Sequence, residues 1–195
     1  MDYDKILLYY LLLESLEEKP KPRHIRHIHN TTVEGVTSHP LLKDVEEYQH
    51  HHHAYGEIYT HDNIVASAAA LQNTWYQLTI FDKNGPYHEC VNDHTNDHIT
   101  VGLTGDYMIN CAVTLFDAQT QDWEFAIYTN NGANYLDNVE CQATTLAASK
   151  VLSTAFCGIV SLTANDTVEV WYKCISAAAQ DVTVKLVNLS LFRML

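Results

Sequence analysis

The sequence predicts an all-β sandwich over residues 57–195, preceded by an apolar helix and an extended, His-rich stem. Three observations predict this fold class. From Gly56 onward apolar and polar residues alternate, which is the period of half-buried strands. Asn, Asp and Gly residues interrupt the alternation at short intervals, where turns are expected. No helical pattern separates the strands, and many short strands in this arrangement favour two packed sheets.

The first predicted element is an N-terminal helix within residues 1–22. Residues 4–18 contain no Gly or Pro and begin with an acidic turn, while Pro20 and Pro22 end the helix. Its middle is apolar on every face, so we expect it to dock on another protein. The run is far shorter than the ~20 residues of a membrane-spanning helix, and it does not have the basic start of a secretory signal. The docking residues are Ile6, Leu7, Leu8, Tyr9, Tyr10, Leu11, Leu12 and Leu13.

Residues 23–56 form the predicted stem or linker, which holds eight of the 12 histidines, at positions 24, 27, 29, 39 and 50–53. His27 and His29 face the same side of an extended chain. In three parallel chains they would bring six imidazoles to one axis, a set suited to a transition-metal ion. Stacked or solvated histidines are the simpler alternative, because a single His-x-His string is short and common. Residues 40–48 are predicted to form a short helix, and residues 50–53 a solvated run.

The strands follow in order after residue 56. The clearest alternation is in residues 167–175, where Val168, Val170, Tyr172 and Cys174 alternate with mostly polar residues. Turns are predicted at residues 83–86, 105–106, 130–132 and 165–166. The predicted strands are residues 57–61, 64–70, 74–81, 98–103, 107–116, 123–129, 154–162, 167–175 and 182–192.

Charge and motif content exclude several functions. The chain has 11 basic and 24 acidic residues, a formal net charge of −13, which repels nucleic acid. It contains no Gly-rich phosphate loop and no nucleophile or zinc-protease motif, so an enzyme is not expected. The five cysteines are odd in number and lack a Cys-x-x-Cys pair, which favours reduced, buried thiols. Residues 92–98 offer oxygen ligands that could hold calcium, but they lack the pattern of a calcium loop and favour a solvated turn.

Several local features occur in a distinctive order after residue 57. They are Trp75-Tyr76-Gln77-Leu78, an Asn-rich loop, Gly105-Asp106-Tyr107 opening a long strand, the segment from Gly158 to Val170, and the terminal Leu189-Ser190-Leu191-Phe192. This order resembles the C1q/TNF-like jelly roll over residues 57–195. The sequence departs from that pattern at Asn165, where Gly is usual, and in having no collagenous stalk. The resemblance implies a homotrimer, and similar domains on short stems occur at the tips of phage and viral fibres.

The composition agrees with assembly, because three Trp, 12 Tyr and five Phe are more aromatic residues than one small core needs. Trp171, Tyr172 and Phe192 are the candidates for the contact between copies. We expect a virion structural protein, a trimeric phage head or tail fibre, made in the host cytoplasm and placed on the particle surface. Its helix would bind other virion proteins and its jelly roll a host-surface receptor or glycan. A capsid decoration (cement) protein and a secreted C1q-like binding module are the alternatives.

Overall fold

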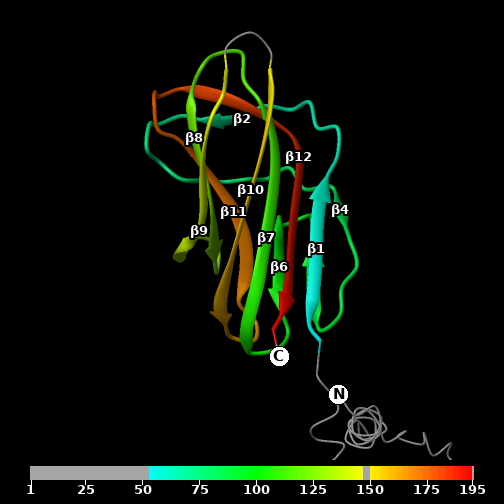
Figure 1. The fold of residues 1–195 in the computed structure, drawn as a ribbon. Coiled ribbons are helices and arrows are strands. Elements are labelled where there is room, and N and C mark those ends of the chain that lie inside the picture. The colour runs from blue at the N-terminus through cyan, green and yellow to red at the C-terminus, as the bar shows by residue number, and fades with distance from the viewer. Residues whose placement is uncertain (1–52, 147–149, 195) are drawn as a thin grey trace, which may run out of the picture. The chain divides into compact units, whose positions relative to one another are not determined.

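The computed structural model describes residues 53–146 and 150–194, which form two antiparallel sheets packed face to face (Figure 1). These ranges contain strands and turns but no helix, so the predicted all-β sandwich is confirmed. None of the described residues belongs to a helix long and apolar enough to cross a membrane. The predicted N-terminal helix and stem lie outside the described residues.

Strand order is that of a jelly roll, in which the first and last strands lie side by side in one sheet. The first sheet has the order β10 (Val151–Leu162), β7 (Gly105–Phe116), β12 (Gln180–Arg193), β1 (Tyr55–Thr60) and β4 (Lys83–Asn84), and β2 (Ser67–Ala69) also pairs with β12. The second sheet has the order β5 (Cys90–Asp93), β6 (His98–Val101), β11 (Thr167–Cys174), β8 (Asp122–Thr129) and β9 (Asn134–Thr144), and β3 (Tyr76–Gln77) also pairs with β11.

The core lies between the two sheets and is made by the alternation seen in the sequence. Every second residue of β7 points inward, including Ile109 and Leu115, which are fully buried. Trp123 and Phe125 of β8 are also fully buried. The indole nitrogen of Trp123 donates a 3.0 Å hydrogen bond to Asp117, so its one polar atom is satisfied. The outward residues of each strand are thereby left on two opposite outer faces.

Two of the predicted turns depend on left-handed backbone conformations. At the β8–β9 turn, Asn130, Asn131 and Gly132 have φ values of 59°, 57° and 79°. The buried carboxylate of Glu169 accepts the backbone N–H groups of Asn131 and Gly132 at 2.9 and 3.0 Å, which fixes this turn. Asn165 has a φ of 78°, which lies in the left-handed region. After glycine, asparagine is the residue that tolerates this region best, so Asn165 can replace the usual glycine.

Several predicted boundaries were wrong. The strands expected at residues 64–70 and 74–81 shrink to Ser67–Ala69 and Tyr76–Gln77, because side-chain hydrogen bonds hold the intervening turns. Lys83–Asn84 pairs with β1 rather than only turning, and Gly105 already belongs to β7. The sequence did not predict β5, which begins an Asn- and Asp-rich stretch, or β9, whose register shifts beside Ala126 and breaks the two-residue period.

Candidate functional site

The outward face of the first sheet carries an apolar row near the end where β1 begins. Register places Tyr55 opposite Phe192, Phe192 opposite Met108, and Met108 opposite Ile159. Tyr55, Phe192 and Ile159 are 41%, 47% and 49% exposed. Met108, which lies between Phe192 and Ile159, is half-buried. Four side chains from four adjacent strands therefore form one apolar line across the sheet, and three of them are exposed.

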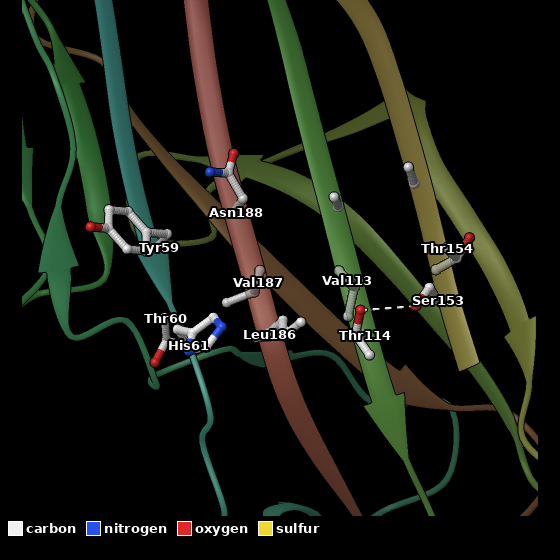
Figure 2. A pocket seen from close by; sticks show the side chains of 12 residues that line it. Tyr59, Thr60, His61, Val113, Thr114, Ser153, Thr154, Leu186, Val187 and Asn188 are labelled. Carbon is white, nitrogen blue, oxygen red and sulfur yellow. Dashed lines mark hydrogen bonds between the residues drawn. The ribbon is translucent and has the colours of Figure 1, made fainter. Parts of the chain in front are cut away.

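A groove of about 540 Å³ lies further along the same face (Figure 2). Its floor is made of small side chains, including Ala112 and its cross-strand partner Ala155. Thr114 and Ser153 satisfy each other through a 3.0 Å hydroxyl contact between β7 and β10. The groove also has Tyr59, Leu186 and Asn188 in its lining. Small, satisfied side chains let a second surface approach the sheet closely.

The electrostatics of this face favour burial. Among the described residues that line the groove there is no Asp, Glu, Lys or Arg, and His61 is the one histidine. Between the groove and the apolar row, register aligns Glu57, Ser190, Asn110 and Cys157 as a polar row. The carboxylate of Glu57 accepts a 2.5 Å hydrogen bond from the amide of Asn188. Covering this face would therefore bury few charged groups without a partner.

The three predicted contact residues do not lie together. Phe192 lies in the apolar row. Tyr172 is only 3% exposed and lies in the core. Burial raises the pKa of its hydroxyl to about 12, and this hydroxyl donates a 2.9 Å hydrogen bond to the carbonyl of Ala68. Its prediction as a contact residue was wrong, because it belongs to the inward set of β11. Trp171 points outward, but from the second sheet, so it lies on the opposite face of the sandwich from Phe192.

Trp171 belongs to an aromatic cluster on that second face. Its ring centroid is 5.0 Å from that of Tyr128, which lies 5.5 Å from Trp75 and 5.3 Å from Tyr135. Lys173 places its ammonium 4.3 Å from the centre of the Trp75 ring and 3.1 Å from a carboxylate oxygen of Glu124. The side chains of the cluster thus cover much of one another's surface. Through Trp75 they also hold the segment before β3 against the sheet.

The remaining predicted sites are placed as follows. In residues 92–98, the amide of Asn92 donates to the carbonyls of Glu57 and Gly85, and Asp93 accepts two backbone N–H groups of its own turn. No three His, Cys, Asp or Glu side chains within residues 53–146 and 150–194 are grouped to hold a metal ion. His27, His29 and the docking residues 6–13 lie outside the described residues, so the axial metal and the helix contact stay predictions.

The sequence did not indicate Tyr55, Met108 and Ile159 as members of one surface. They come from β1, β7 and β10. Only the pairing of β1 and β7 with β12, and of β10 with β7, brings them into line. Alternation identified them as outward residues at most, because it carries no information on which strands become neighbours.

Comparison with solved structures supports the fold. The structure of Eiger TNF from S. frugiperda superposes with a TM-score of 0.53 at 13% sequence identity, covering 73% of this chain and 94% of that chain. Murine APRIL at pH 5.0 gives a TM-score of 0.48 at 13% identity, covering 73% of this chain and 99% of that chain. No protein-family model and no curated protein matches the sequence. The similarity to Eiger confirms a TNF-like jelly roll and, at this identity, concerns the fold alone.

Proposed function

We propose that this chain is a homotrimeric recognition module, a binding protein rather than an enzyme. The observation that carries the proposal is the apolar row of Tyr55, Phe192, Met108 and Ile159 beside a groove whose described lining has no Asp, Glu, Lys or Arg, on one face of the first sheet. A contiguous apolar line of this kind marks an interaction surface in a water-exposed protein. The resemblance to C1q/TNF-like jelly rolls, whose members are homotrimers, supports a second and third copy as its cover.

The trimer uses two different surfaces of each copy. In a closed three-fold ring the contact is heterologous, so the outward face of the first sheet packs against another part of the next copy. The apolar row supplies the free energy of association, and the small side chains of the groove allow close approach. The opposite face carries the aromatic cluster around Trp75, whose rings pack against one another, and it remains exposed to solvent.

We further propose that the trimer is a virion structural protein, a phage head or tail fibre on the particle surface. In this arrangement residues 6–13 bind other virion proteins and the jelly roll binds a host-surface receptor or glycan. All five cysteines are free thiols, and Cys90, Cys111 and Cys174 are buried. Free thiols are consistent with assembly in a reducing host cytoplasm and support this setting over a secreted C1q-like module. A capsid decoration protein is the alternative that would share the trimer but need no receptor.

Two measurements test the proposal on the full chain. Light scattering after size exclusion should give three times the chain mass of 22.1 kDa. A monomer at micromolar concentration would remove the trimer from the proposal. Quantitative mass spectrometry of purified particles should find the chain in multiples of three copies. A stable trimer that is missing from particles would favour the secreted module.

A further inference from the structure

The turn that follows β1 exposes two large apolar side chains to water. Ile64 is 85% exposed, the highest value among the large apolar residues described, and Val65 is 65% exposed. We call these two residues the Ile64–Val65 knob. An apolar pair this open contributes nothing to its own core and is costly to keep in water.

The knob is held rigidly. The amide of Asn63 donates to the carbonyls of Val184 and Val65, both at 2.9 Å, and its oxygen accepts the N–H of Val65 at 3.0 Å. The backbone N–H of Asn63 also donates to the carbonyl of Lys185 at 3.0 Å. Two of these bonds tie Asn63 to β12, and the other two join Asn63 to Val65 across Ile64. A turn fixed in this way loses little conformational entropy when it binds, which is the condition for an efficient anchor.

A hollow of about 330 Å³ lies beside the knob and is acidic at its rim. Ala66, which follows the knob, lines it together with Phe116 and the exposed Asp181. Asp117 also lines the hollow, but its two oxygens are already engaged by the N–H of Gln119 and the indole of Trp123. On the other side of the knob, the exposed Asp62 lies 2.9 Å from the Nδ1 of His61. Lys185 of β12 places its ammonium 5.8 Å from the centre of the Phe116 ring. The hollow therefore offers a cationic side chain space and one exposed carboxylate, that of Asp181.

The position of the knob places it away from the start of the fold. Register pairs Tyr55 with Phe192 at one end of the sandwich and Thr60 with Val187 toward the other, so the turn after Thr60 lies at the end where β12 begins (Figure 1). The chain before residue 55 joins the opposite end. The knob therefore lies at the end of the sandwich opposite the Tyr55–Phe192 pair.

We propose that the Ile64–Val65 knob and the adjacent hollow form a docking surface for a partner protein that presents a large apolar side chain with a Lys or Arg side chain next to it. The inference rests on the proposed function as a recognition module and names its partner surface. An anionic lipid bilayer fits less well, because the carboxylate of Asp181 and the net charge of −13 repel anionic headgroups. The net charge of −13 steers cationic surfaces toward the chain.

The test uses the full chain and a displayed library of random 12-residue peptides as the probe. Enriched peptides should combine a large apolar residue with Arg or Lys. A synthetic peptide of the leading sequence should bind Ile64→Ser and Asp181→Asn variants at least tenfold more weakly than the unaltered chain. Raising the salt concentration should weaken binding to the unaltered chain more than to Asp181→Asn. Val91→Ser is the matched control, since Val91 is 61% exposed on β5 of the second sheet, and its peptide affinity should not change.

Four outcomes would overturn the inference. They are no enrichment, enriched peptides without basic residues, equal affinity for Ile64→Ser, and binding of phosphatidylcholine vesicles that depends on Ile64. Thermal melts of each variant establish that the fold is retained. Oligomeric mass is measured on the same samples, and trimer loss in Ile64→Ser would identify the knob as a contact between copies instead. A monomeric chain that binds peptide through Ile64 would refute the trimer alone, whereas a trimer without peptide binding would refute only the docking surface.

Discussion

Replacing Phe192 by serine should dissociate the trimer without unfolding the protomer. The side chain is 47% exposed in the single chain, so association removes up to about 90 Å² of the roughly 200 Å² of an aromatic side chain from water. At ~25 cal/mol per Å² this is about 2 kcal/mol per copy and about 6 kcal/mol per trimer. Because 1.4 kcal/mol corresponds to a factor of ten, the three-body dissociation constant should rise by about four decades. The midpoint concentration of assembly scales as its square root and should rise roughly 100-fold.

Sedimentation equilibrium over a dilution series of the full chain measures this midpoint directly. Ile159→Ser, from the same apolar row, should shift the midpoint in the same direction, since Ile159 is 49% exposed. Val91→Ser removes an apolar side chain that is 61% exposed on the other sheet and should leave the midpoint unchanged. Circular dichroism melts of dilute, monomeric samples should agree within a few degrees among the variants, because none of the three side chains belongs to the core.

The reasoning fails if Phe192→Ser and Val91→Ser shift the midpoint equally, because the apolar row would then have no special role. It also fails if Phe192→Ser leaves a trimer at the lowest concentration while Val91→Ser dissociates it. That result would place the contact between copies on the second sheet.

Three further predictions follow. Cys157 is exposed in the protomer and lies in the polar row of the first sheet, so iodoacetamide should label it slowly in the trimer and rapidly in Phe192→Ser; equal rates would argue against a covered face. Burial raises the pKa of Asp97 to about 6 from 3.8, so the folded state binds the extra proton between these values and the free energy of unfolding falls as pH rises through this window. Asp97→Asn, which keeps an oxygen to accept the Phe81 N–H, should flatten that fall in urea titrations at pH 4 and 7, and an unchanged difference between the two pH values would contradict the assignment. Gly132→Ala should lower the free energy of unfolding by about 1–2 kcal/mol, because a left-handed residue gains a Cβ that would lie 2.5 Å from the Trp171 ring; an unchanged thermal midpoint would be inconsistent with the fixed turn.

The strands that the sequence predicted well are those whose inward and outward positions alternate over their whole length. β7 and β10 run for 12 residues each with inward and outward positions in strict alternation, and their sequences show the same period. β9 escaped prediction because its register shift places Leu136 opposite Ile127 and Glu140 opposite Ala126, so the residues between them fall out of phase. β3 and β4 are two-residue pairings that depend on partners far along the chain, and no local pattern of that length specifies them.

The candidate site was only partly predictable for a related reason. Alternation separates inward from outward residues, so it correctly grouped Tyr172 with the apolar, inward set of β11, although the surplus of aromatic residues had suggested a contact between copies. It cannot tell which of two outer faces an outward residue occupies, because that depends on which sheet the strand joins. Trp171 and Phe192 both point outward, but β11 pairs with β8 in the second sheet while β12 lies between β7 and β1 in the first. The distribution of apolar residues among the faces is thus a property of non-local pairing, and the function that depends on one face becomes visible only when that pairing is known.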